Sequence, residues 1–181
     1  MRSRCAGRSS NLWLGAAAGA VGGLAGSGAI VMFNHLIGRS ENGERPHQHR
    51  RNAASPNETD ATISDEPASM QVASLASERI AGAPLGERGK QIGGSLIHYL
   101  FGASVGAVYG AAAEFQRGAT ANGGLPFGTA VWIAADELGL PLVGLARAPT
   151  EYPPARHLAA FASHLVFGAT TEAVRRGLRG A

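Results

Sequence analysis

Four long apolar runs separated by polar segments dominate the pattern along the chain. They cover residues 12–37, 92–115, 125–146 and 157–174. The first run holds 26 residues without Asp, Glu, Lys or Arg, whereas a helix needs only roughly 20 residues to cross a bilayer core. The apolar region of a signal peptide is shorter, at about 7–15 residues, so an uncleaved anchor is favoured. The pattern predicts an all-α integral membrane bundle of about four Gly/Ala-rich transmembrane helices, with the lipid bilayer as its surroundings.

Polar segments divide the chain around these runs. Residues 1–11 form a basic N-terminal tail, and residues 38–90 carry 15 of the 29 acidic and basic residues, counted from Arg39 to Lys90. This composition predicts a largely disordered loop after the first span. Within it, residues 68–81 contain few helix breakers and predict a short helix. Residues 91–181 are then a membrane domain that ends in a basic C-terminal tail.

Glycine recurs at steps of four inside the apolar runs. The chain has 26 glycines among 181 residues, about double the usual frequency of roughly 7%. Steps of four place glycines along one narrow ridge of a helix, and small residues there allow close helix packing in lipid. Such ridges could also form a homo-oligomer, and the alternative is helices that merely tolerate glycine. The residues predicted to pack helices are Gly15, Gly19, Gly23, Gly102, Gly106, Gly110 and Gly168.

Ionisable residues also lie inside the runs, where they are costly and usually functional. The Asp136-Glu137 pair is the most informative, since one central acidic residue costs about 2.5 to 3.5 kcal/mol on insertion scales. Pro141 removes the helical bond of the Glu137 carbonyl and predicts a helix break there. The alternative is a re-entrant or strongly tilted segment that brings the pair to an interface. The candidate polar intramembrane site comprises His98, Glu114, Asp136, Glu137, His164 and Glu172.

The histidines allow two interpretations. His98 and His164 both begin the pattern H-x-x-F-G-A, which indicates either a weak internal repeat of the transporter kind or a chance similarity of packing. Each imidazole either bonds a neighbouring backbone carbonyl or accepts protons. His157 and His164 are seven residues apart and share a helix face, but no third ligand follows at a fixed spacing. The sequence therefore predicts no metal site and no cofactor.

Charge sets the expected orientation. Basic residues before the first run, at Arg117 and after the last run predict that both termini are cytoplasmic, because basic flanks remain on that side. The net charge is only +3, and no dense basic patch contains aromatic residues. Nucleic-acid binding is therefore not expected.

Several of these residues also carry a resemblance to a known family. They include His98 to Gly102, Gly106 to Gly110, Trp132, Asp136-Glu137, Pro141, Gly144-Leu145, His157, His164 to Gly168, Glu172 and Arg175-Arg176. With these motifs, residues 68–179 resemble the YagU-like bacterial inner-membrane family, a domain of unknown function. The resemblance implies a location in the bacterial inner membrane and supplies no catalytic residue.

Three classes of function remain open. A structural or interaction protein is favoured, because helix packing explains many of the observations. The alternative is a proton-linked or small-solute conduit that uses the intramembrane histidines and carboxylates. A membrane-embedded enzyme ranks third, and we expect no enzymatic activity, because no nucleophile elbow, phosphate loop or metal motif occurs in the sequence.

Overall fold

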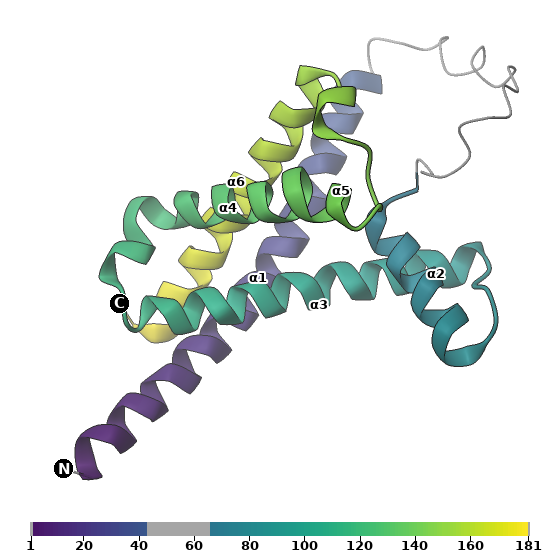
Figure 1. Cartoon of the computed structure of the whole chain (residues 1–181). Coiled ribbons are helices and arrows are strands. Elements are labelled where there is room, and N and C mark those ends of the chain that lie inside the picture. Colours follow the sequence, from purple (N-terminus) through teal and green to yellow (C-terminus); the bar gives the residue numbers. More distant parts are fainter. Residues whose placement is uncertain (1, 43–65, 181) are drawn as a thin grey trace, which may run out of the picture.

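The computed structural model describes residues 2–42 and 66–180, and all regular elements within these ranges are helices (Figure 1). The predicted disorder falls mainly on residues 43–65, outside the described part. The α-helices are α1 (Arg2–Asn42), α2 (Ala68–Ala81), α3 (Glu87–Ala113), α4 (Leu125–Trp132), α5 (Leu140–Leu142) and α6 (Pro154–Arg179). The 3₁₀-helices η1 (Arg117–Gly124) and η3 (Pro149–Glu151) and the π-helix η2 (Ile133–Gly139) lie between them. The fold is all-α, as predicted.

The helix ends differ from the predicted boundaries. α1 includes most of the predicted basic tail, and α3 begins at Glu87, before the predicted start of the second run. α6 extends through the predicted basic C-terminal tail to Arg179. Pro154 suits the first turn of α6, because that turn needs no N–H donor. The helix ends at Gly180, whose φ of 68° is readily adopted by glycine.

Two helical segments are long and apolar enough to cross a membrane, judged by length and composition. They are Asn11–Ile37 within α1 and Glu87–Ala113, which is α3. The third predicted run is not one continuous α-helix, because α4 passes into η2 and then α5. In η2 the Leu140 N–H donates to the carbonyl of Ala135, five residues earlier. Pro141, where the sequence predicts a helix break, lies in α5 directly after η2, and the segment ends at Gly144, which has a φ of 74°.

α1 is the central helix and packs closely on α3. Gly15, Gly19 and Gly23 face Gly110, Gly106 and Gly102, so the two helices run antiparallel. A Cβ atom on Gly19 would lie only 2.8 Å from the Gly110 Cα atom, so no side chain fits between the backbones. The glycine ridges predicted to pack helices therefore meet each other within one chain.

α6 packs on a neighbouring face of α1 and also on α4. Gly22 and Gly26 of α1 face Thr171 and Phe167, again in antiparallel order. The Ser163 hydroxyl donates to the Asn34 side-chain oxygen at 2.7 Å, farther along the same pair of helices.

The contact between α4 and α6 is equally close. A Cβ on Gly128 would meet the His164 backbone, and one on Gly124 would meet the backbone of Gly168. Gly124 also has a φ of 85°, which favours glycine where η1 passes into α4. α2 lies against the first half of α3, where Gly93 and Gly94 face Ala73 and Met70.

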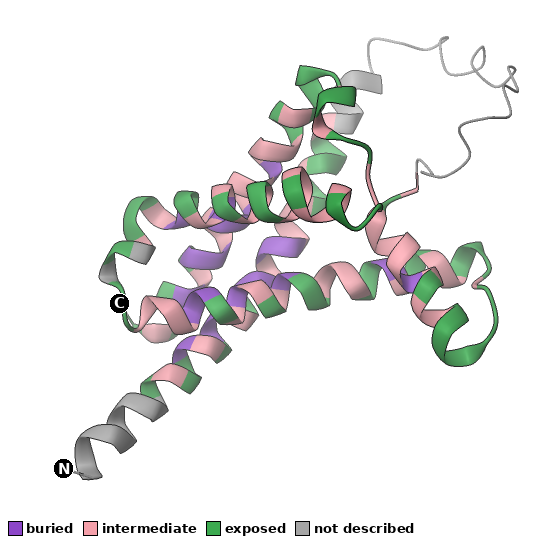
Figure 2. Cartoon of the chain, viewed as in Figure 1, coloured by how far each residue is buried: buried purple, intermediate pink, exposed green. Residues whose placement is uncertain are grey.

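The interior contains mainly small and polar residues and few large apolar ones. Buried residues gather where α1, α3, α4 and α6 meet (Figure 2). The buried hydrophobic residues of the described chain are Ala18, Ala73, Tyr109 and Phe167, and the buried polar ones are Ser27, Ser163, Thr171, Glu172 and Arg175. Most large aliphatic side chains of α1 and α3 lie on the outside.

Candidate functional site

One face of α6 carries most of the ionisable side chains inside the bundle. His157, His164, Glu172, Arg175 and Arg179 follow each other at steps of seven, eight, three and four residues. These steps are close to whole turns of a helix, so the residues share a face. We call this face the α6 stripe. Its polar side chains lie against α1, α3, α4 and η2. There they belong to two separate clusters of residues.

The first group surrounds Glu172, whose exposed fraction is 1%. Arg175 donates from Nε to Oε2 at 2.6 Å and from Nη2 to Oε1 at 3.0 Å, and Arg176 donates from Nε to Oε1 at 2.5 Å. The Tyr109 hydroxyl of α3 donates to Oε2 at 2.9 Å. We call these four residues the Glu172 cluster. Both carboxylate oxygens are bonded, which such a buried charge requires.

Further contacts tie the end of α6 to its neighbours. Arg176 also donates from Nη2 to the Thr120 carbonyl of η1 at 2.8 Å. Arg179 binds both oxygens of Glu114, which follows α3, at 3.0 Å each. The end of α6 thus bonds directly to η1 and to the residue that follows α3.

An aromatic layer continues from the Glu172 cluster. The Tyr109 ring stacks on Phe127 of α4 with a centroid distance of 4.1 Å. Phe127 in turn lies 5.7 Å from the Phe167 ring of α6. This layer joins α3, α4 and α6, on which the three rings lie.

The second group lies where α6 passes η2, and we call it the His–carboxylate cluster: His98, Asp136, Glu137, His157 and His164. His157 contacts Glu137 Oε1 from Nδ1 at 2.8 Å and the Pro149 carbonyl from Nε2 at 2.9 Å. A carbonyl only accepts, so Nε2 carries a proton. The Nδ1 contact then joins either a protonated His157 to an ionised Glu137 or a neutral His157 to a protonated Glu137. In both cases one proton lies between the two side chains.

His164 and His98 lie around the neighbouring carboxylate, Asp136. His164 Nδ1 donates to the Ala160 carbonyl at 2.9 Å and lies 3.7 Å from Asp136 Oδ2, within ion-pair but beyond hydrogen-bond distance. His98 is within electrostatic reach of the same carboxylate. Its Nε2 atom is buried without a hydrogen-bond partner among the described residues, and so is Trp132 Nε1. Buried polar atoms without partners are rare and need an explanation.

The predicted site residues therefore divide between two places. Glu114 and Glu172 lie among arginines at one end of the α6 stripe, while the other predicted residues belong to the His–carboxylate cluster. Of the histidines in the two H-x-x-F-G-A patterns, His164 lies 3.7 Å from Asp136, and His98 is within electrostatic reach of it. Within the described ranges, no group of three or more His, Cys, Asp or Glu residues could hold a metal ion.

Sequence reasoning missed the partners of the glutamates. The C-terminal arginines were interpreted as a basic flank, although Arg175 and Arg176 follow Glu172 by three and four residues. That spacing is a local signal of helical ion pairs. Tyr109 and the Glu114–Arg179 pair had no such signal, since 63 residues separate Tyr109 from Glu172 and 65 separate Glu114 from Arg179.

Comparison with known proteins supports the resemblance found in the sequence. No curated protein and no solved structure shows significant similarity to this chain. A family model does match. The match begins just before α2 and ends within α6, one residue after Glu172, so it includes the His–carboxylate cluster and Glu172. The YagU-like resemblance agrees with this family. Over residues 67–173, the chain belongs to the family described as "Protein of unknown function (DUF1440)".

Proposed function

We propose that the chain is a multi-pass protein of the bacterial inner membrane with a structural or interaction role. In this proposal α1, α3, the segment from α4 to α5, and α6 each cross the bilayer. The distribution of side chains carries the argument. Large apolar groups cover the outside, whereas the interior holds glycines, hydroxyl groups and ion pairs.

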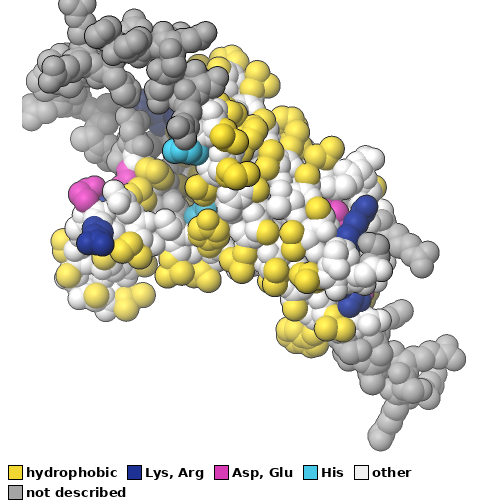
Figure 3. Space-filling view, turned by 180° about the vertical axis from the view of Figure 1, so that it is seen from behind, with side chains coloured by type: hydrophobic (Ala, Val, Ile, Leu, Met, Phe, Trp, Pro, Cys, Tyr) yellow, Lys and Arg dark blue, Asp and Glu magenta, His cyan; other side chains and the backbone are white. Residues whose placement is uncertain are grey.

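The surface supports contact with lipid. Trp13 and Val108 are 75% and 71% exposed, and many other large apolar residues of α1 and α3 are at least half exposed. Hydrophobic side chains cover the middle of the molecule, and charged ones lie toward its two ends (Figure 3). Water-soluble monomers rarely expose such continuous apolar surface. In a bilayer this surface is solvated by acyl chains.

The helix directions support both termini on one side. α3 and α6 are each antiparallel to α1, and α4 is antiparallel to α6. The chain therefore alternates in direction across the bundle. Arginines are frequent at the end that holds the start of α1 and the end of α6, so we assign this end to the cytoplasm.

Two measurements test this topology. The protein should stay in the membrane fraction after alkaline carbonate extraction. A reporter fused after Arg179 should be active only in the cytoplasm, and one inserted near Asn57 only on the far side. Finding both reporters on the same side would exclude the proposed arrangement.

A proton-linked conduit is the second candidate, and the Asp136 surroundings favour it. Asp136 lies in a π-helix, an element that is common at functional sites. His164 lies 3.7 Å from it, and His98, within electrostatic reach of it, has a buried nitrogen without a partner among the described residues. Such groups are suited to accept and release protons. The glutamates at the other end are instead paired with arginines.

Proteoliposomes with an internal pH dye distinguish the two roles. If the chain conducts protons, Asp136→Asn should abolish the flux, because the amide has a similar shape but cannot titrate. Glu151→Gln, which neutralises an exposed carboxyl in η3, serves as the control and should leave the flux unchanged. If the parent protein gives no flux under a proton gradient, the structural role stands and the conduit is rejected.

A further inference from the structure

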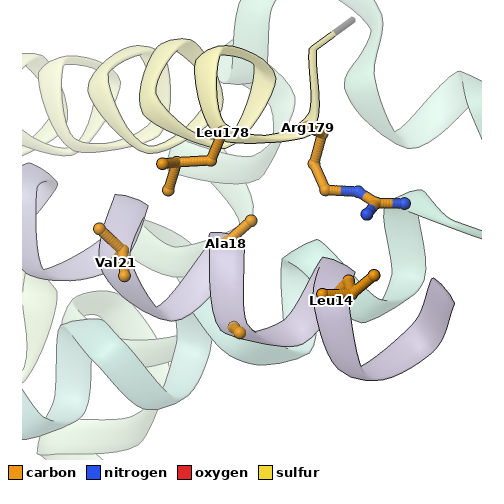
Figure 4. Close-up of a pocket in the computed structure, with 6 residues that line it drawn as sticks. Leu14, Ala18, Val21, Leu178 and Arg179 are labelled. Carbon is orange, nitrogen blue, oxygen red and sulfur yellow. The ribbon is translucent and has the colours of Figure 1, made fainter. Parts of the chain in front are cut away.

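A surface groove between α1 and α6 lies at the arginine-rich end of the bundle. It is lined by Leu14, Ala17, Ala18, Val21, Leu178 and Arg179 (Figure 4). The two alanines leave space on α1, and Leu14 and Leu178 are each more than half exposed beside it. The groove is open on its outer side, so its apolar lining is available to a ligand from the surroundings.

Arg179 brings positive charge to this groove. Arg179 lines it, and Arg176 lies one turn earlier on α6 and is partly exposed. Glu114 engages two of the three Arg179 nitrogens, and a guanidinium has five N–H donors. Arginine-rich pockets between helices on the cytoplasmic side of a membrane bind anionic headgroups.

We propose that this groove binds an anionic phospholipid, with one acyl chain against Ala17 and Ala18 and the phosphate beside Arg179. The proposal rests on the membrane location proposed above. A second copy of the chain fits less well, because the glycine ridges of α1 are already covered by α3 and α6. A second apolar helix would also bring no anion to the arginines. The exposed Trp13 next to Leu14 is typical of the headgroup level, where Trp is enriched.

The test is native mass spectrometry of the full chain in detergent, titrated separately with phosphatidylglycerol and phosphatidylcholine. The parent should bind phosphatidylglycerol roughly fivefold more tightly for each arginine that reaches the phosphate. Ala17→Phe should remove this binding, because the ring fills the groove from an exposed position. Its thermal unfolding should match the parent.

Charge variants test the headgroup. Arg179→Gln should bring the affinity for phosphatidylglycerol toward that for phosphatidylcholine. Glu114→Gln breaks the same ion pair but keeps the guanidinium, so it should bind phosphatidylglycerol at least as well as the parent. Arg147→Gln removes an exposed arginine between α5 and η3, and it should bind like the parent.

The outcomes separate this inference from the proposed function. Equal affinity for the two lipids, or unchanged binding by Ala17→Phe, would overturn the lipid site. A dimer that Ala17→Phe dissociates would assign the groove to a second copy and overturn it as well. Release of the protein by carbonate extraction would instead reject the membrane location itself.

Discussion

Glu172 is almost completely buried, and it bonds to three other side chains. It is the largest fully buried side chain of the described residues, and two arginines and a tyrosine saturate its oxygens. A buried ion pair of this kind contributes little net stability relative to an apolar pair, but losing one partner leaves an uncompensated charge. The cluster therefore makes the position and rotation of α6 relative to α3 sensitive to single substitutions.

Glu172→Gln should destabilise the protein by about 3 to 5 kcal/mol, because Arg175 then remains buried without its counter-charge. Thermal unfolding in detergent measures the effect. Glu87→Gln is the matched control, since Glu87 is exposed and lies 3.9 Å from Lys90. Such a surface pair contributes about 0 to 1 kcal/mol. Equal melting temperatures for the two variants would show that Glu172 is not buried among its partners.

At the scale of elements, the contact between α1 and α3 depends on the absence of side chains. Each glycine of one ridge lies against the backbone of the other, so even a methyl group has no space. Close approach allows dispersion contacts along the helix backbones, which is a main source of helix association in lipid. The π-helix is the opposite case, since there the backbone widens and carries Asp136 and Glu137 toward α6.

One substitution should therefore have opposite effects at two glycines. Gly106→Ala should destabilise by about 1 to 3 kcal/mol, because its Cβ would lie 2.9 Å from the Gly23 Cα atom. Gly177→Ala should stabilise α6 by about 0.5 to 1 kcal/mol, since the described chain places nothing within 4 Å of its Cβ position. Melting temperatures of the two variants in one detergent give the comparison. A stabilising effect at Gly106 would mean that the two helices do not pack through their glycines.

At the scale of the whole molecule, the described chain exposes most of its large aliphatic side chains and buries mainly small and polar residues. Under the proposed membrane location the bilayer is part of the fold, because the exposed side chains of α3 are favourable in an apolar environment. α2 differs, since it lies outside the four proposed spans.

Leu100→Lys and Ile80→Lys separate the two environments. Leu100 is exposed in the middle of α3, where a lysine should cost about 2.5 to 3.5 kcal/mol of insertion and lower the amount of protein in the membrane. Ile80 of α2 is 87% exposed, and the same change there should leave accumulation near the parent level. Quantitative blots of membrane fractions measure both. Normal accumulation of Leu100→Lys would indicate that this face of α3 contacts water.

The all-α fold could be predicted from the sequence because its signal is local. The positions of the apolar runs and the glycine steps follow from helical periodicity, which each segment expresses by itself. The ion pairs at the end of α6 were harder to predict from the sequence, because a basic flank and a helix with i,i+3 and i,i+4 ion pairs have the same composition. The division of six candidate residues into two groups was also not predictable, since it depends on which helix faces meet.

The sequence by itself determined that the chain is helical, where its long apolar helices lie, and that glycine forms ridges on α1 and α3. These properties arise from backbone hydrogen bonds and side-chain spacing within one segment. Only the tertiary structure decided that Glu114 meets Arg179, that Tyr109 meets Glu172 and that Asp136 lies 3.7 Å from His164. The physical reason is that such pairs join different helices. Their formation depends on the rotation and depth of each helix, which close packing of the whole bundle sets.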